Sequence, residues 1–330
     1  MTNLTAQRSL GRRAAMSLAG MALASPATLR AQTPVSGPIR VVVPYSTGGT
    51  ADLVTRSVGD RMSAALGVPV VPDYRPGANL MIGAQIAATA PPDGRTLFLG
   101  TGTSHSLNPL LRSNLPYRPE QLVPVIPLTE NAYIIVVPPD SQARTLAEFV
   151  ALARVQQGGM NFGTFGAGNI NHLGMELLAQ LSGITMNSVP YRIGVQSDVD
   201  LMAGRLDVLM TTLTILPHIR SGAVRALAVT TPQRYPLLPE VPTVAEQGYP
   251  GYDVRGWFSF FAPAGTSEQI LARFNTEANA ALRDPAVSAA FAPHGLTPLG
   301  GSAADLGAMI AAENARWGPI IQRLGLRDKV

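Results

Sequence analysis

Apolar residues in this chain gather in short runs, which alternate with segments where they recur every three or four positions. The first run, Ile39–Pro44, consists mainly of β-branched residues and predicts a buried strand. Val54, Val58, Met62 and Leu66 follow at a spacing of four, which places them on one face of a helix. The pattern continues with strands at Val68–Val71 and Thr96–Gly100 and, between them, a helix that ends near Ala88.

A second series of the same kind begins near the middle of the chain. Its expected strands are Tyr133–Val137, a segment ending at Asn161–Gly163, Val208–Thr211 and Ala226–Thr230, and its expected helices are Thr145–Arg154 and His172–Leu181. The strand Tyr252–Phe261 leads back, and the remaining chain is mostly helical, at Ile270–Leu282, Pro285–Phe291 and Ala303–Leu324. This alternation predicts parallel strands with crossover helices, arranged in two successive α/β units.

The N-terminal segment has the layout of an export signal. A basic stretch at 7–13 precedes the alanine-rich apolar segment Ala14–Leu29, which is too short to span a bilayer comfortably. Leu29-Arg30-Ala31 is a suitable cleavage motif, and Ala22-Leu23-Ala24 is a second one. We therefore expect residues 1–31 to be a signal peptide and the mature protein to be periplasmic, exported by the general or the twin-arginine route. An amphipathic N-terminal helix of the folded domain is the alternative.

The charge distribution argues against a nucleic-acid partner. The full chain carries a net charge of +4, but Arg8, Arg12, Arg13 and Arg30 all lie in the expected signal peptide. Without them, Lys+Arg falls from 25 to 21 and equals the 21 Asp+Glu, so the expected mature protein is formally neutral. Nucleic-acid-binding domains keep a basic surplus. The absence of cysteine from the sequence also excludes disulfides and thiolate metal sites.

Two glycine-rich loops each lead from an expected strand into an expected helix. The first is Val43–Asp52, in which Ser46 or Thr50 is available to cap the helix. The second is Gly163–Asn169. Unpaired amide groups at a helix N-terminus attract anions, so two such loops on facing units predict a clamp for a small acid. Two ordinary strand-to-helix turns are the alternative.

Signatures of enzymes are missing from the sequence. It contains no Gly-x-x-x-x-Gly-Lys-Ser/Thr motif, no Gly-x-Gly-x-x-Gly spacing in the second loop and no Gly-x-Ser-x-Gly elbow. Ser104 and His105 are adjacent, and adjacent side chains are not expected to face each other as nucleophile and base. His172, near a helix start, is expected to hydrogen-bond the second loop or a ligand. We therefore predict no catalysis, no cofactor and no metal site.

Motifs distributed over nearly the whole expected mature chain occur in an order typical of one receptor family. They are Val43-Pro44-Tyr45-x-x-Gly48-Gly49-x-x-Asp52, Arg75-Pro76-Gly77-Ala78, Pro92-Asp93-Gly94-x-Thr96-Leu97, Asn108-Pro109-x-Leu111, Leu115-Pro116-Tyr117, His172-Leu173-x-x-Glu176-Leu177, Val189-Pro190-Tyr191-Arg192, Leu216-Pro217-His218-Ile219-Arg220-Ser221-Gly222-x-x-Arg225-Ala226-Leu227-Ala228-Val229-Thr230 and Leu238-Pro239-x-Val241-Pro242-Thr243-Val244-x-Glu246. Over about residues 38–325 the chain resembles the Bug family, the solute receptors of tripartite tricarboxylate transporters.

The resemblance implies a two-domain Venus-flytrap (periplasmic-binding-protein) clamp of the α/β class. We expect one domain at 32–131 plus 255–330 and the other at 132–254, with strands crossing near Asn131–Tyr133 and Tyr252–Arg255. The implied function is that of a periplasmic receptor, a monomer, which captures a small organic carboxylate for the membrane subunits of the transporter. A ligand sensor for a membrane signalling protein and an enzyme on the same fold are the alternatives.

The resemblance also implies that backbone amides of the two loops hold the ligand carboxylate, partly through bridging waters and without an Arg or Lys clamp. The expected ligand-binding residues are Tyr45, Ser46, Gly48, Gly49, Thr50, Asp52, Thr103, Ser104, Thr164, Gly166, Gly168, Asn169 and His172. Leu80 and Met81 stand where the family has small residues, so they favour an apolar pocket and an aromatic or aliphatic acid over aspartate or glutamate. Packing of these two side chains into the core is the alternative.

Overall fold

The computed structural model describes residues 36–191 and 194–329, so the predicted signal peptide lies outside the described residues. The strands are β1 (Ile39–Val43), β2 (Val70–Tyr74), β3 (Thr96–Gly100), β4 (Leu122–Val137), β5 (Met160–Thr164), β6 (Met186–Pro190), β7 (Val208–Thr212), β8 (Arg225–Val229), β9 (Arg255–Pro263) and β10 (Leu296–Pro298). The helices are α1 (Thr50–Leu66), α2 (Met81–Ala88), α3 (Asn108–Leu111), α4 (Leu146–Val155), α5 (Ile170–Ser182), α6 (Gly194–Met202), α7 (Leu216–Arg220), α8 (Glu268–Leu282), α9 (Pro285–Phe291) and α10 (Ala303–Leu324). A π-helical turn, η2, covers Thr103–Leu107.

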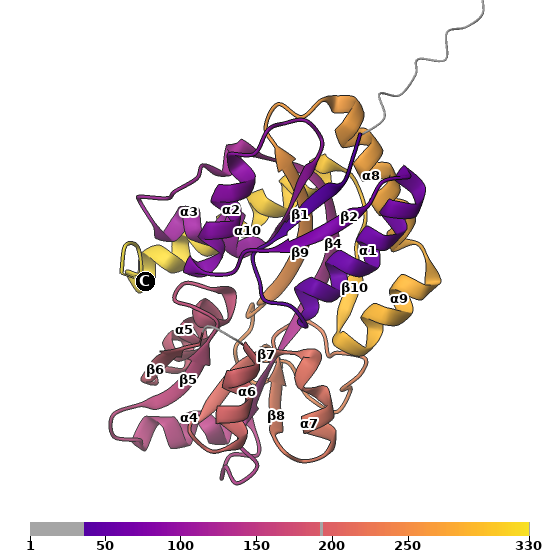
Figure 1. Cartoon of the computed structure of the whole chain (residues 1–330). Coiled ribbons are helices and arrows are strands. Elements are labelled where there is room, and N and C mark those ends of the chain that lie inside the picture. Colours follow the sequence, from indigo (N-terminus) through magenta and orange to yellow (C-terminus); the bar gives the residue numbers. More distant parts are fainter. Residues whose placement is uncertain (1–35, 192–193, 330) are drawn as a thin grey trace, which may run out of the picture. The chain divides into compact units, whose positions relative to one another are not determined.

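A single mixed sheet runs through the described residues in the order β2-β1-β3-β9-β4-β7-β5-β6, and both β10 and β8 pair with β4. The long strand β4 connects the two halves of this sheet (Figure 1). Up to Ala132 it is antiparallel to β9, and from Tyr133 it pairs with β7. We call the part built on β1, β2, β3, β9 and β10 half A, and the part built on β5, β6, β7 and β8 half B.

Strand direction differs from the sequence-based expectation at the centre of the sheet. The strands β1, β2 and β3 are parallel to one another, and so are β5, β6 and β7, as the strand–helix alternation predicts. However, β9 is antiparallel to both β3 and β4, and β4 is antiparallel to β7. The predicted parallel pairing therefore holds within each α/β unit and does not extend to the two connecting strands.

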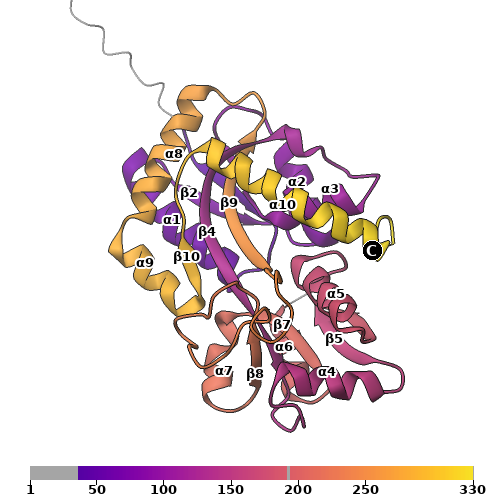
Figure 2. The same ribbon diagram turned by 180° about the vertical axis from the view of Figure 1, so that it is seen from behind.

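Alternating residues of β1 show how half A buries both faces of its sheet. Val41 and Val43 pack into a cluster with Phe274 of α8, and residues of α1 and α9 complete it. Val42 points the other way, into a cluster with residues of α2 and with Leu306 of α10. Figure 2 shows α10 lying across β4 and β9 on that second face. Because both faces are covered, β1 is apolar at every position except the half-buried Arg40.

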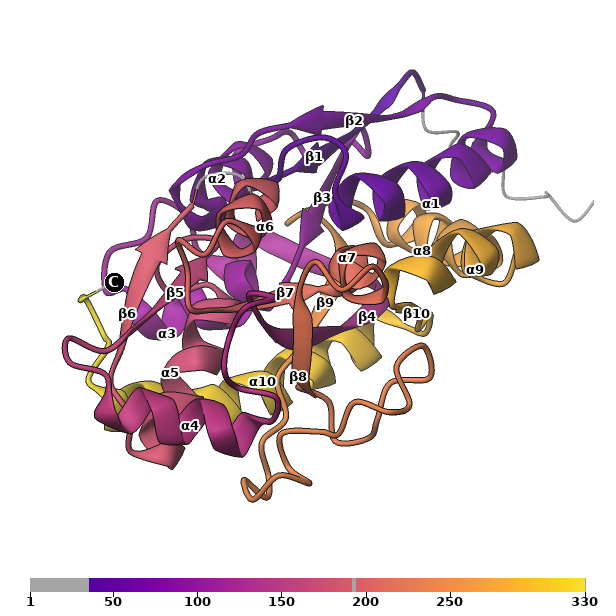
Figure 3. The same cartoon turned by 90° about the horizontal axis from the view of Figure 1, so that it is seen from below.

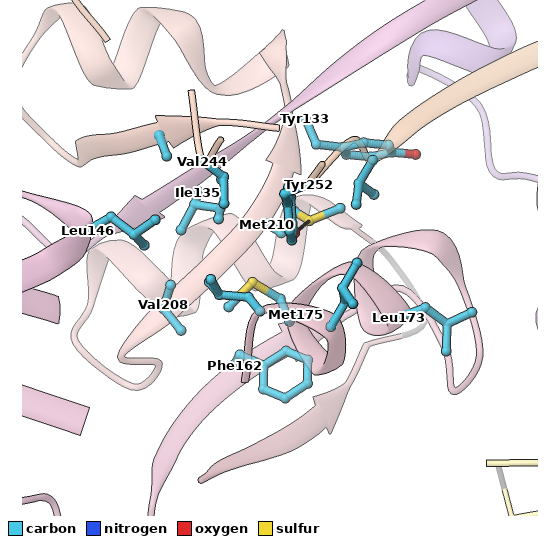
Figure 4. Close-up of a cluster of buried hydrophobic side chains, with 14 of the residues drawn as sticks. Tyr133, Ile135, Leu146, Phe162, Leu173, Met175, Val208, Met210, Val244 and Tyr252 are labelled. Carbon is cyan, nitrogen blue, oxygen red and sulfur yellow. Dashed lines mark hydrogen bonds between the residues drawn. The ribbon is translucent and has the colours of Figure 1, made fainter. Parts of the chain in front are cut away.

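Half B repeats this arrangement with other helices. Ile135 of β4 packs with residues of α4 and α5, whereas its neighbour Ile134 packs with residues of α6 and α7. Figure 3 shows these helix pairs on the two sides of the strands. Figure 4 shows the first of the two clusters, in which Met175 of α5 and Met210 of β7 lie near Tyr252. The Tyr252 hydroxyl donates to the Gly174 carbonyl at 2.9 Å and ties the chain that approaches β9 to α5.

Most predicted elements are present, with some displaced boundaries. β3 and α10 have the predicted bounds, and β2 begins two residues later than predicted. β4 is much longer than the predicted Tyr133–Val137. The elements β6, β10, α3, α6 and α7 were not predicted. No helix among the described residues is long and apolar enough to cross a membrane.

Candidate ligand-binding site

A cavity lies where β4 and β9 pass between the two halves. Its lining comes from the segments after β1 and β3 (Tyr45, Thr103), from the connecting strands (Tyr133, Trp257), from the first residue of α5 (Ile170) and from α10 (Glu313). Its volume of about 20 Å³ is room for roughly one water molecule. This arrangement of the two halves therefore leaves space for a single functional group and not for a whole ligand.

The first loop connects β1 to α1 and is organised by Asp52. The Gly48 amide donates to Asp52 Oδ2 at 2.9 Å, while Asp52 Oδ1 accepts from Tyr74 at 2.6 Å and from Arg56 at 2.7 Å. Burial of Asp52 acts to raise its pKa, but the hydrogen bonds from Tyr74, Gly48 and Arg56 outweigh it, so the pKa lies below its usual value. Asp52 is thus ionised and holds the loop in place, and both of its carboxylate oxygens already accept hydrogen bonds.

Neither glycine-rich loop supplies a side-chain cap to its helix. The N-cap residue of α1 is Gly49, so the predicted capping by Ser46 or Thr50 is wrong. At α5, the N-cap residue Asn169 makes no capping hydrogen bond with its side chain. The first-turn amides of α5 therefore keep the partial positive charge that attracts an anion, whereas at α1 the ionised Asp52 of the first turn offsets part of this charge. Ser46, Gly48 and Gly49 are exposed, and Thr50 is half-buried.

The second loop connects β5 to α5 and is held by His172. Gly166 and Gly168 have φ angles of +121° and +79°, which favour glycine. The Gly168 amide donates to His172 Nδ1 at 2.9 Å, so this ring carries its proton on Nε2, 3.5 Å from Glu176 Oε1. His172 is buried, and its ring stacks on Phe162. The structure therefore places His172 as a support of the loop.

Two buried polar atoms in the second loop have no hydrogen-bond partner among the described residues. They are Thr164 Oγ1, at the end of β5, and Asn171 Nδ2, in the first turn of α5. Both residues are at most 1% exposed. Buried polar groups nearly always have partners, so these two mark a place where a polar ligand or a water completes the site. The sequence pointed to Thr164 but not to Asn171.

The neighbouring turn η2 contains Thr103, Ser104 and His105. Thr103 lines the cavity, whereas Ser104 is fully buried and bonds the backbone of Thr101. Ser104 Oγ also lies 2.9 Å from His105 Nδ1, so the expectation that these two side chains do not face each other is wrong. The π-helical turn brings them together. Burial lowers the pKa of His105 to about 3, and its ring stacks on Phe261 at 3.6 Å.

A left-handed segment of half A faces the second loop. Ala78, Asn79 and Leu80 all have positive φ angles, and Asn79 exchanges two 2.9 Å hydrogen bonds with Asn108. A Cβ added to Gly166 would lie 3.4 Å from Asn79 Oδ1, so the segment lies against the loop. Leu80 itself is buried, and Met81 packs on the α2 cluster. Neither side chain lines the cavity. Packing of Leu80 and Met81 into the core, the alternative to an apolar pocket, is what the structure shows.

Charged groups at the cavity were missed by the sequence analysis. Arg255 lines it, but it bonds Asp253 at 2.7 Å and Glu130 at 2.9 Å and is therefore neutralised. The Glu313 carboxyl accepts a 2.6 Å hydrogen bond from Trp257 Nε1, and burial raises its pKa to about 7. The expected helix Ala303–Leu324 is amphipathic, and nothing in its local pattern separates Glu313 from its surface-facing polar residues.

The described residues contain no group of three or more His, Cys, Asp or Glu that could hold a metal ion. Of the predicted site residues, Tyr45 and Thr103 line the cavity, Asp52 and His172 hold the two loops, and Ser104 is buried in η2. Tyr45 packs edge-on against Phe258, with ring centroids 6.0 Å apart. The arrangement is suited to polar capture of a small anion and provides no accessible nucleophile with a base.

Comparisons with known proteins identify the family to which the chain belongs. A family model described as Tripartite tricarboxylate transporter family receptor matches residues 54–326. BugT of Bordetella pertussis is 33% identical over 306 residues, which are 92% of this chain and 94% of that protein. A solved structure of R. palustris Rpa4515 with adipate has a TM-score of 0.83 at 32% identity, covering 88% of this chain and 98% of that one.

MatC from Rhodopseudomonas palustris, solved with bound malate, has a TM-score of 0.80 at 29% identity, covering 87% of this chain and 99% of that one. The periplasmic binding protein BugD has a TM-score of 0.82 at 28% identity, so the α/β fold with two connecting strands is that of periplasmic binding proteins. Since the family model spans most of the sequence and BugT matches nearly its whole length, this chain belongs to the Bug family of tripartite tricarboxylate transporter receptors.

Proposed function

We propose that this protein captures a small organic carboxylate in the periplasm and delivers it to the membrane subunits of a tripartite tricarboxylate transporter. One observation carries the proposal: the uncapped start of α5 adjoins the buried, unpartnered polar atoms of Thr164 and Asn171. The uncapped start of α1 provides a second set of amides in half A. Because the similar receptors Rpa4515 and MatC hold adipate and malate, we take a mono- or dicarboxylic acid as the ligand class.

Capture would proceed by closure of two domains, 32–131 with 255–330 and 132–254, around the acid. The change of partner along β4, from β9 at Ala132 to β7 at Tyr133, supports a hinge at this position. Closure would bring the two glycine-rich loops to opposite ends or sides of one carboxylate. A protein of this kind needs no chemistry on its ligand, and the Ser104–His105 pair is sealed from solvent.

The expected selectivity against amino acids rests on two carboxyl groups, Asp52 in the first loop and Glu313 in the cavity wall. Ionisation of Glu313 is disfavoured because burial raises its pKa to about 7. A buried ligand ammonium needs an acceptor, usually a carboxylate, because an unpaired buried charge is costly. Asp52 is the acid of the first loop, and its oxygens already accept from Gly48, Tyr74 and Arg56. We therefore expect acids without an ammonium group to bind in preference to aspartate or glutamate.

A thermal-shift screen of the mature protein tests the proposal. The panel contains malate, adipate, citrate and benzoate, with aspartate, glutamate and glucose as comparisons. A ligand at roughly 100 times its Kd stabilises the folded state by about 2.7 kcal/mol, which for a chain of this size raises Tm by a few degrees. The proposal predicts such a rise for at least one organic acid, and no rise with any acid in the panel would contradict it.

Two matched threonine variants then locate the site. Thr164 and Thr129 are both buried strand residues whose hydroxyls have no partner among the described residues, but Thr129 lies on the part of β4 in half A. Thr164→Val should weaken acid binding roughly tenfold to a hundredfold, because a hydrogen bond to a charged group contributes about 1.5–3 kcal/mol. Thr129→Val should leave affinity unchanged. Equal affinities in the two variants would place the ligand elsewhere.

A further inference from the structure

Glu313 reaches the cavity from the helix that closes the chain. It lies in the middle of α10, and its carboxyl accepts from Trp257 Nε1 at 2.6 Å. A Cβ added to Gly102 would come within 2.7 Å of Glu313 Oε2, so the carboxyl lies directly against the backbone next to Thr103. The fold thus places a carboxyl group in the wall of the cavity that Tyr45 of the first loop and Ile170, the first residue of α5, also line.

The other charged groups around Glu313 are already compensated. On β9, Arg255 is paired with Asp253 and Glu130, and one turn along α10 Arg316 bonds Asp253 at 3.2 Å. Neither the Arg255 nor the Arg316 guanidinium forms an ion pair of comparable length with the Glu313 carboxyl. Burial raises the pKa of Glu313 and outweighs the charge of Arg316, which acts to lower it, and among the described residues that line the cavity no cation is left to pair with an ionised Glu313.

The remaining titratable groups near the cavity stay neutral in the physiological range. Burial raises the pKa of Tyr45 to about 12 and that of Tyr133 further still. His105 in η2 has a pKa of about 3 because it is buried, so it carries no charge. Among the described residues that line the cavity, Glu313 is thus the group whose charge changes near neutral pH.

We propose that Glu313 contacts the ligand as a neutral carboxylic acid, so that capture of a carboxylate is coupled to the uptake of one proton from solvent. This inference rests on the proposed function, since it takes the ligand carboxylate to enter the same cavity. Two ionised carboxylates side by side repel each other strongly. A protonated Glu313 can instead donate its hydrogen to the ligand while its other oxygen keeps the hydrogen bond from Trp257.

The coupling gives the binding constant a defined pH dependence. Only the protonated form binds the anion well, so affinity should fall about tenfold per pH unit above the pKa of Glu313. A ligand whose ammonium group binds the ionised form would show the opposite trend, with affinity rising through the same range. The sign of the pH dependence therefore separates the two chemistries.

The ionisation itself is measured first, without ligand, by tryptophan fluorescence. The chain has only two tryptophans, Trp257 and Trp317, and only Trp257 bonds the Glu313 carboxyl in the structure. A fluorescence change centred near pH 7 should be present in wild type and in Trp317→Phe, and absent in Glu313→Gln and Trp257→Phe. A titration that persists in Glu313→Gln would show that another group is responsible and would overturn the assignment.

Calorimetric titration with adipate and with malate, from about pH 6 to about pH 9, then tests the coupling. Wild type should lose up to about a hundredfold in affinity between about pH 7 and about pH 9, whereas Glu313→Gln, which mimics the neutral acid, should vary far less. Glu277→Gln is the matched control, because Glu277 lies on α8 and pairs with Arg273 away from the cavity. It should retain the wild-type profile.

The outcomes are distinguishable. Binding that is equally strong across the range in wild type, or that falls with pH equally in Glu313→Gln, overturns the proton coupling and leaves the receptor function standing. Affinity that rises with pH overturns it in favour of an ammonium-bearing ligand. If neither these acids nor any other in the thermal-shift panel binds even at about pH 6, the proposed function fails and the coupling fails with it.

Discussion

Replacing Glu313 by glutamine should change the pH dependence of stability even in the absence of ligand. In the folded protein burial raises the pKa of Glu313 from 4.5 to about 7. At about 1.4 kcal/mol per pH unit, this difference corresponds to roughly 3 kcal/mol. Because the residue as a whole is only half-buried, solvent screening reduces the effect, and we expect about 2 kcal/mol.

The direction follows from proton linkage. The folded state holds this proton more tightly than the unfolded chain, so the contribution of Glu313 to stability is present below a pH of about 4.5 and is lost as the pH rises to about 7. Glutamine cannot ionise and keeps an acceptor for Trp257 Nε1, so the variant avoids this loss. The variant should thus equal wild type near pH 5 and exceed it by about 2 kcal/mol near pH 8.

Urea unfolding at about pH 5, 6, 7 and 8 measures this difference, provided that the m-values of the two proteins agree. The gap in unfolding free energy should open between about pH 5 and about pH 7 and then remain constant. A gap that is the same at every pH would show that Glu313 titrates in its ordinary range, and it would refute the reasoning from burial.

Other predictions concern the loops and the N-terminus. Gly49 has open space for a Cβ and an ordinary φ of −95°, so Gly49→Val should fold normally. The variant should lose acid affinity in calorimetry, and an affinity equal to that of wild type would contradict the role of this loop. Gly168→Val should lose affinity and in addition about 1–3 kcal/mol of stability in urea, because its φ of +79° strains a β-branched residue. His172→Ala removes the acceptor of the Gly168 amide and the ring that stacks on Phe162, so it should weaken binding about tenfold and lower stability in urea by about 1–3 kcal/mol. Unchanged affinity would contradict the role of His172 as a support of the loop. Mass spectrometry of periplasmic protein should find the first 24–31 residues removed, and an intact chain in that fraction would refute export by signal cleavage.

The local pattern of the sequence was sufficient to predict the bounds of elements whose apolar residues form a regular pattern. β3 and α10 were placed at their observed bounds because the first is a continuous apolar run and the second has a clear helical period. The missed part of β4 contains Pro124 and Pro127, which argue against a strand when they are judged locally. In the structure they lie at irregularities of the β4–β9 register, where a missing amide donor is tolerated.

Some residues of the site could likewise be predicted from the local sequence, and others could not. Glycine-rich loops between strands and helices are visible in the sequence because their chemistry is local, and Tyr45 and Thr103 do line the cavity. Glu313 was invisible, because only tertiary packing of α10 brings it to Trp257, which is 56 residues away in sequence. Ser104 and His105 were misjudged because a π-helical turn, which has no simple sequence signature, redirects the two side chains.

A crystal structure of the protein grown with the acid that gives the largest thermal shift would show where the carboxylate binds. We expect the ligand carboxylate between the start of α1 and the start of α5, with Thr164 Oγ1 or Asn171 Nδ2 within hydrogen-bond distance. An acid bound elsewhere, for example in the apolar groove lined by Leu216, Leu237 and Pro293, with these two atoms still unpartnered, would contradict this expectation.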